Sequence, residues 1–174
     1  MNRNLKSLIL TALLSTGTML SAASANTYIQ AGIGQYTYEE EDTTSYNLGL
    51  GTDTTYNNNV YFGFDFDVNF GEMYSEQLIG MGMDVNLGYT FMKSLSPYAF
   101  VGYNLQAIYD SDESQFDSYI GFGYGVGVNY KISDSFAVDA KYKMATLDYW
   151  DNSDTGYSGD MDFSSLGINI KYLF

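Results

Sequence analysis

The charged residues best suited to chemistry in this sequence come as two pairs with the same spacing. Asp65 and Asp67 lie in one alternating segment, and Lys141 and Lys143 lie in another. Residues two apart point to the same face of a β-strand, so each pair places two like charges on one surface. Such groups can act as acids and bases, or can pair with one another inside a confined space.

The rest of the composition argues against catalysis. The chain has no histidine and no cysteine, so a Ser-His or Asp-His mechanism, a disulfide and a lipoprotein anchor are all unavailable. The glycines of segment 121–127 recur at every second residue with no helix after them, unlike a nucleotide-binding loop. We predict that the protein is not an enzyme and uses no cofactor.

One acidic segment weakly resembles a calcium-binding loop. Positions one, three, five, six and twelve of that template fall on Asp151, Ser153, Thr155, Gly156 and Asp162. Serine, threonine and a terminal aspartate are poor ligands there, and no helices flank the segment. The alternative is a solvated polar loop, and we predict no specific metal site.

The first 25 residues have the pattern of a secretory signal peptide. Arg3 and Lys6 precede an apolar stretch, and Ala23-Ser24-Ala25 forms the small-residue cleavage site. The apolar stretch is too short and too polar for a good membrane-spanning helix. We therefore expect a signal peptide at residues 1–25 and a single domain at residues 26–174.

The charge balance excludes several partners. The chain has 21 acidic and seven basic residues, and two of the basic residues lie in the predicted signal peptide. Such an excess of negative charge argues against direct binding of nucleic acid, heparin or another polyanion. No run of about 18 apolar residues follows the signal, so a helical membrane protein is also excluded.

Alternation of apolar and polar residues fills the predicted domain. The clearest case is 60–70, where one face consists of Val60, Phe62, Phe64, Phe66, Val68 and Phe70. Similar strands are expected at 27–38, 45–54, 78–91, 98–109, 118–131, 135–147 and 164–174. Tight turns alternate with longer acidic connections at 39–45, 72–77, 110–117 and 148–162. Strands of about ten residues match the membrane span of a tilted strand.

The composition of the two strand faces predicts which one meets lipid and which one lines the barrel interior. The apolar face, rich in Phe, Tyr, Val and Met, is too extensive to fit inside an eight-stranded barrel. The other face carries mostly Gly, Asn, Asp and Lys, which suits a crowded interior. We therefore predict an all-β fold: an eight-stranded antiparallel up-and-down transmembrane β-barrel with its apolar face outward.

The last strand carries a terminal pattern. Ser165, Gly167, Ile170 and Tyr172 have polar-x-Gly-x-x-apolar-x-aromatic spacing, and Phe174 extends the alternation. This pattern resembles the signal that outer-membrane barrels offer to their assembly machinery. With the signal peptide and strand count, it makes the chain similar to small outer-membrane β-barrels, including the transmembrane domain of outer-membrane protein A and the adhesin-like barrels.

That resemblance implies a Gram-negative outer membrane, reached through the periplasm, and an assembly signal formed by Gly167, Ile170, Tyr172 and Phe174. Phe174 can also serve as an anchor at the periplasmic interface, where aromatic residues gather.

In such a barrel, the third strand lies opposite the seventh. We therefore expect a mid-lumen ion-pair network that blocks free passage, similar to the plug of related barrels. Its members are Asp65, Asp67, Asp84, Lys141 and Lys143. The alternative is that each charge is separately hydrated in a wet lumen.

The expected role is structural or adhesin-like, through acidic extracellular loops; the alternative is a narrow pore for small solutes. The four long connections contain no Lys or Arg, so they would attract divalent cations and repel bare phosphates. The expected partners are outer-membrane lipid and lipopolysaccharide (through such cations), the barrel-assembly machinery, and a host or cell-surface ligand.

Overall fold

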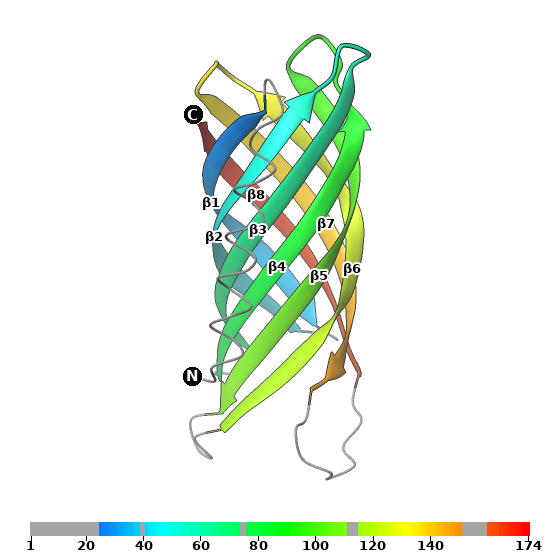
Figure 1. Cartoon of the computed structure of the whole chain (residues 1–174). Coiled ribbons are helices and arrows are strands. Elements are labelled where there is room, and N and C mark those ends of the chain that lie inside the picture. The colour runs from blue at the N-terminus through cyan, green and yellow to red at the C-terminus, as the bar shows by residue number, and fades with distance from the viewer. Residues whose placement is uncertain (1–24, 39–40, 74–75, 111–114, 151–159) are drawn as a thin grey trace, which may run out of the picture.

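The computed structural model of the chain forms one closed β-barrel (Figure 1). It describes residues 25–38, 41–73, 76–110, 115–150 and 160–174. The strands are β1 (Asn26–Tyr38), β2 (Glu41–Thr55), β3 (Val60–Met73), β4 (Glu76–Tyr89), β5 (Leu95–Asp110), β6 (Gln115–Lys131), β7 (Phe136–Tyr149) and β8 (Asp160–Leu173). Within these residues, no helix has the length and apolar character needed to cross a membrane.

Each strand pairs antiparallel with the next strand in sequence, and β8 returns to pair with β1. The closing ladder runs from Tyr28 opposite Leu173 to Tyr38 opposite Phe163. Closure leaves no unpaired sheet edge. The predicted eight-stranded antiparallel barrel is therefore confirmed. β1 begins at Asn26, whereas residues 1–24 of the predicted signal peptide lie outside the described residues.

Three tight turns, after β2, β4 and β6, lie at one end of the barrel, which we call the turn end. Asn59, Met92 and Lys93 adopt positive φ angles of 65°, 51° and 65° there. Asparagine tolerates this left-handed conformation better than most residues do. The C-terminus lies at the same end, where the Phe174 N–H donates to the Thr27 carbonyl at 2.9 Å.

The opposite end, which we call the loop end, differs from the sequence prediction. The prediction of long connections at 39–45 and 72–77 was wrong, because the strands continue into both segments. Thr37 pairs with Asp42 across the β1–β2 ladder, and its hydroxyl donates to the carboxylate at 2.7 Å. Threonines and a paired carboxylate are compatible with a strand, so the sheet extends until only residues 39–40 separate β1 from β2.

Over most of the barrel, the apolar face points outward, as predicted. Ile168 and Phe122 are 55% and 74% exposed, whereas the inward carboxylates of Asp65 and Asp84 are fully buried.

The polarity inverts at the loop end of β7 and β8. There, apolar side chains turn inward and form a buried cluster: Tyr36, Ala145, Leu147, Met161 and Phe163. The intervening residues Thr146, Asp148 and Asp162 are exposed on the outside. This part of the sheet buries apolar residues inside and presents polar residues outside, as a water-soluble barrel does.

Candidate functional site

Four of the five residues predicted for the lumen network come together at the middle of the barrel. The Lys141 ammonium lies 2.7 Å from Asp65 Oδ2 and 3.0 Å from Asp84 Oδ2. Lys143 lies 2.9 Å from the same Asp84 oxygen and donates to Asn104 Oδ1 at 2.9 Å. We call Asp65, Asp84, Lys141 and Lys143 the mid-lumen layer.

Glycines give these long side chains their room. A methyl group on Gly102 would overlap the Asp84 carboxylate, and one on Gly125 would come within 2.6 Å of the Phe100 ring. With both sites left open, Phe100 lies beneath the two ammonium groups. Its ring centroid is 4.7 Å from Lys141 Nζ and 5.6 Å from Lys143 Nζ. An aromatic face at this distance attracts a cation, so it helps to hold both lysines across the lumen.

Asp67 does not join the mid-lumen layer. Among the described residues it takes part in no ion pair within 4.0 Å, and it accepts a hydrogen bond of 2.7 Å from Asn69 Nδ2. Asp65 pairs with Asp84 across the β3–β4 ladder, whereas Asp67 pairs with Gly82, closer to the loop end. Lys141 and Lys143 reach the level of Asp65 and Asp84, which lies farther from the loop end, so Asp67 lies apart from the ion pairs.

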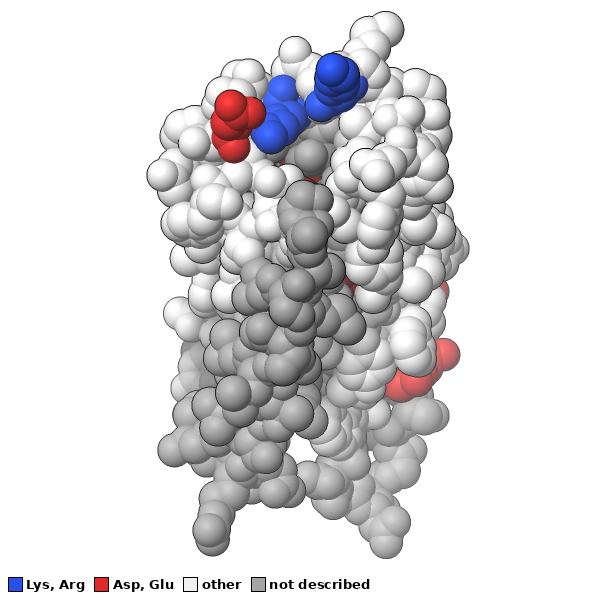
Figure 2. Space-filling model, turned by 45° about the horizontal axis from the view of Figure 1, so that its top comes forward, with Lys and Arg blue, Asp and Glu red and all other residues white. Residues whose placement is uncertain are grey.

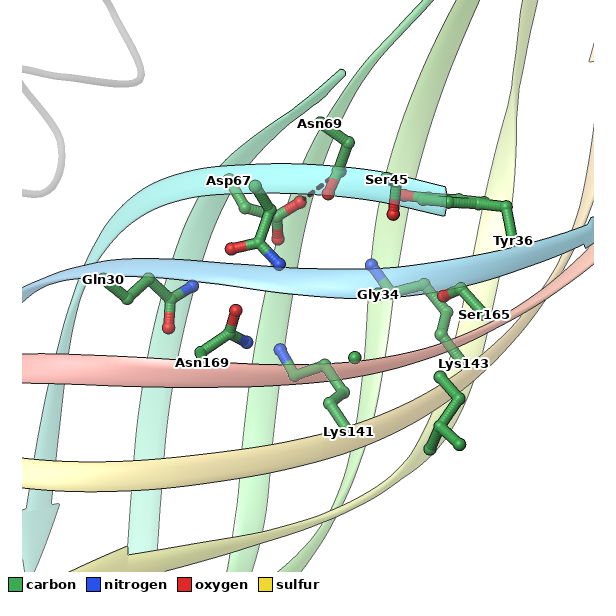
Figure 3. A pocket seen from close by; sticks show the side chains of 13 residues that line it. Gln30, Gly34, Tyr36, Ser45, Asp67, Asn69, Lys141, Lys143, Ser165 and Asn169 are labelled. Carbon is green, nitrogen blue, oxygen red and sulfur yellow. Dashed lines mark hydrogen bonds between the residues drawn. The ribbon is translucent and has the colours of Figure 1, made fainter. Parts of the chain in front are cut away.

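Asp67 instead lines a polar cavity of about 40 Å³ (Figure 3). Gln30, Asn169 and Lys141 also line this cavity, and the amide oxygens of Gln30 and Asn169 accept no hydrogen bond from any residue that the structure describes. At about 10–15 Å³ for each water, the cavity has room for roughly three waters.

A second buried layer, not predicted from the sequence, lies between the mid-lumen layer and the turn end. It consists of Tyr28, Tyr61 and Tyr98 with Asp139 and Lys171. The Tyr98 hydroxyl lies 2.9 Å from both oxygens of Asp139, and Lys171 Nζ lies 3.4 Å from Asp139 Oδ2. Tyr28 donates to Asp65, which links the two layers. We call the three tyrosines the tyrosine layer.

The residues of the predicted assembly signal lie on both faces of β8. Ile170, Tyr172 and Phe174 point outward and are exposed, and the rings of Tyr172 and Phe174 are 5.1 Å apart. Gly167 points inward, where an added methyl group would meet nothing closer than 3.8 Å. The arrangement is compatible with both an anchor and a recognition signal, so the assembly role stays a prediction.

Most of the weak calcium pattern, including Asp151 to Gly156, lies outside the described residues. Asp162 faces outward and accepts a 2.6 Å hydrogen bond from Thr146. No set of three or more acidic side chains in the described part of the chain is arranged to hold a metal ion.

Charge is distributed unevenly between the two ends. Lys93 and Lys131 lie at the turn end, where Figure 2 shows basic side chains at the rim, and Lys131 is 3.6 Å from Asp134. The acids of the loop end whose side chains the structure describes are Asp42, Glu72, Glu76, Asp117, Asp148, Asp160 and Asp162. No described Lys or Arg lies among them.

A closed barrel with an apolar exterior and a charged interior is the architecture of a transmembrane β-barrel. The chain belongs to the outer membrane protein beta-barrel domain family, whose model matches residues 8–174. It is therefore an outer-membrane protein. In such barrels short turns face the periplasm and longer loops face outward. The longest connection, between Tyr149 and Asp160, leaves from the loop end, so we expect that end to be extracellular and the turn end to be periplasmic.

Solved structures support the same fold. Neisserial surface protein A has a TM-score of 0.57 and 15% identity, covering 86% of this chain and 97% of that one. Ail, the attachment invasion locus protein of Yersinia pestis, has a TM-score of 0.55 and 14% identity, with the same coverage. A major outer membrane protein from Thermus thermophilus has a TM-score of 0.52 and 13% identity, covering 87% of this chain and 100% of its own. No curated protein matches the chain in sequence.

Proposed function

We propose that this barrel is a closed structural or surface-interaction protein and does not conduct solutes. The observation that carries the proposal is the mid-lumen layer, in which two lysines cross the lumen and bind two buried carboxylates. Breaking such a pair leaves a buried charge without its partner, at a cost of about 3–5 kcal/mol. Thermal motion alone therefore seldom opens this layer.

Two further obstacles support a closed lumen. The tyrosine layer lies below the ion pairs, and the buried apolar cluster around Leu147 and Phe163 lies above them. A hydrated ion would have to break the ion pairs and cross an apolar constriction. The cavity of about 40 Å³ between these levels has room for water, and Lys141 and Lys143 of the mid-lumen layer form part of its lining.

We also propose that the extracellular end provides the contact with other molecules. Ail is named the attachment invasion locus protein, and this supports an adhesin-like role in a barrel of this shape. Ail was also solved with a heparin analogue, sucrose octasulfate. The acidic loop end of this chain would repel such a polyanion, so its ligand would be neutral, cationic or bridged by divalent cations.

The remaining partners follow from the proposed route and location. Export through the periplasm would use the predicted signal peptide at residues 1–25, and insertion would use the β8 residues Gly167, Ile170, Tyr172 and Phe174. Divalent cations would connect the acidic loop end to lipopolysaccharide. A catalytic role is not proposed, because the chain has no histidine.

Conductance in planar lipid bilayers tests the closed lumen. We expect the folded wild-type barrel to show no steady channel activity, and Lys141→Ala with Lys143→Ala to show small openings. The exposed turn residue Lys93→Ala serves as the matched control. Steady conductance by the wild type would instead support the narrow pore, the alternative function.

Cell adhesion tests the surface role. Bacteria that display the barrel are compared with bacteria that display a variant in which residues 151–159 are replaced by a short Gly-Ser linker. We expect the variant to keep its folded barrel and lose binding to matrix or host cells. Equal binding by both strains would argue against a role for this connection.

A further inference from the structure

The outward face of the barrel is not equally apolar around its circumference. On each of β1 to β4, six outward positions can be compared over a span of ten residues. At about 3.3 Å per residue and a tilt of about 40°, that span is roughly 25 Å in height, the usual height of the apolar band.

On β3 and β4, all six outward positions are apolar. They are Val60, Phe62, Phe64, Phe66, Val68 and Phe70 on β3, and Ile79, Met81, Met83, Val85, Leu87 and Tyr89 on β4. β6 has the same pattern from Ile120 to Tyr130. These strands present a full-height apolar surface to the hydrocarbon.

On β1 and β2, only three consecutive inner positions of the six are strongly apolar or small. β1 reads Thr27, Ile29, Ala31, Ile33, Gln35 and Thr37, and β2 reads Thr54, Thr52, Leu50, Leu48, Tyr46 and Thr44. We call these twelve residues the β1–β2 face. Three apolar positions span four residues, or roughly 10 Å in height.

The two faces can be compared at equal height. The hydroxyls of Thr55 and Thr90 lie 2.9 Å apart, so the periplasmic ends of β2 and β4 are level. Their neighbours Thr54 and Tyr89 therefore lie at similar heights. Thr44 and Ile79 lie ten residues farther along their strands, again at similar heights. At both levels β2 presents a hydroxyl where β4 presents an apolar side chain.

We propose that the bilayer is locally thinned where it meets the β1–β2 face. Polar side chains prefer water or headgroups to hydrocarbon, and a short apolar span draws the bilayer surfaces together. The polar positions occur at both ends of the span, so both leaflets are affected. Lipid beside β1 and β2 is then compressed relative to lipid beside β3 to β6.

Single-cysteine labelling tests this directly, because the chain has no cysteine of its own. The variants Thr44→Cys, Ile79→Cys, Thr54→Cys and Tyr89→Cys are each labelled with an environment-sensitive fluorophore and folded into dioleoyl phosphatidylcholine vesicles open to iodide on both sides. Only the folded, heat-modifiable fraction is measured. We expect iodide to quench the labels at 44 and 54 at least about threefold more strongly than the labels at 79 and 89, because ions enter hydrocarbon poorly.

Three results would overturn the proposal. Equal quenching at all four sites would mean an even bilayer. A shallow label at 44 with a deep label at 54 would mean that the whole barrel tilts. Disulfide formation between copies at 44, or quenching that changes on dilution in lipid, would mean that a second copy covers the β1–β2 face.

A label-free measurement complements the test. Wild type and the double variant Thr44→Leu with Thr54→Leu are refolded into phosphatidylcholine vesicles with chains of 12 to 16 carbons. If the bilayer is thinned, the yield of folded double leucine variant should be highest in lipid with longer chains than the lipid that is best for the wild type. The double variant Thr44→Ser with Thr54→Ser should show no such shift. No shift in the leucine variant would contradict the proposal.

Discussion

Asp65 and Asp84 face each other directly across the β3–β4 ladder, with both carboxylates fully buried. Like charges in directly opposed positions destabilise a sheet. Here Lys141 binds one oxygen of each carboxylate, at 2.7 and 3.0 Å, and Lys143 binds Asp84 at 2.9 Å, so a third strand supplies the cations that offset the repulsion. The contact joins β3 and β4 to β7 across the lumen.

The first prediction concerns that lysine. Lys141→Met should lower the free energy of unfolding by about 3–5 kcal/mol, because two opposed carboxylates lose their shared cation. Urea unfolding followed by heat-modifiable electrophoresis measures the loss. Lys93→Met, in an exposed turn, should leave stability unchanged. Adding Asp65→Asn to Lys141→Met should recover part of the loss, because Asp65 has no other ion pair among the described residues, whereas Asp84 keeps Lys143 at 2.9 Å. No recovery would mean that the loss is one of packing.

The second prediction separates the two inward aspartates of β3. Asp65→Asn should destabilise the barrel clearly, since Asp65 binds Lys141 and accepts from Asn86 at 2.9 Å. Asp67→Asn should have a smaller effect, because Asp67 faces a polar cavity and has no ion pair among the described residues. Thermal unfolding of the two variants under identical conditions decides the order. A larger effect at Asp67 would argue for a lysine contact there.

The third prediction uses two glycines of the lumen. Gly102→Ala should destabilise the barrel by about 1–3 kcal/mol, since its methyl group would overlap the Asp84 carboxylate and approach the Met83 carbonyl at 2.5 Å. Gly167→Ala should be tolerated, because its methyl group would have only ordinary contacts at 3.8 Å or more. Denaturant midpoints measure both. Equal losses would show that backbone freedom matters more than space at these positions.

The fourth prediction distinguishes an assembly signal from a membrane anchor. Phe174 and Phe136 are both exposed aromatic residues near Tyr172 at the periplasmic end, but only Phe174 belongs to the terminal pattern. Phe174→Asp should reduce the yield of folded barrel in cells much more than Phe136→Asp does. In pure lipid vesicles, without assembly machinery, the yield of folded barrel should fall by similar amounts in both variants. Similar yields in cells would leave Phe174 as an anchor alone.

The sequence predicted the fold well because strand alternation directly determines which residues face lipid. The outward apolar row from Val60 to Phe70 can be identified from the sequence of that strand alone, without knowing which strands lie beside it. Contacts in the lumen were harder to predict, because they depend on the relative heights of residues on three or four different strands. Asp67 was assigned to the lysines for that reason, whereas the register places Asp65 opposite Asp84 and leaves Asp67 nearer the loop end. Tyr28 and Tyr98 were missed because tyrosine suits both faces of such a strand.

The inverted polarity of β7 and β8 bears on how a large partner could reach this protein. Met144 is the last apolar outward residue of β7, and the strand continues five residues to Tyr149, a further rise of roughly 12 Å. Thr146 and Asp148 face outward along that rise, and Leu147 faces inward. With the loop end outward, as expected, these ends of β7 and β8 would stand in the aqueous sugar layer above the lipid. An antibody fragment could then approach their polar flank, formed by Thr146, Asp148 and Asp162, from the side without reaching the headgroups.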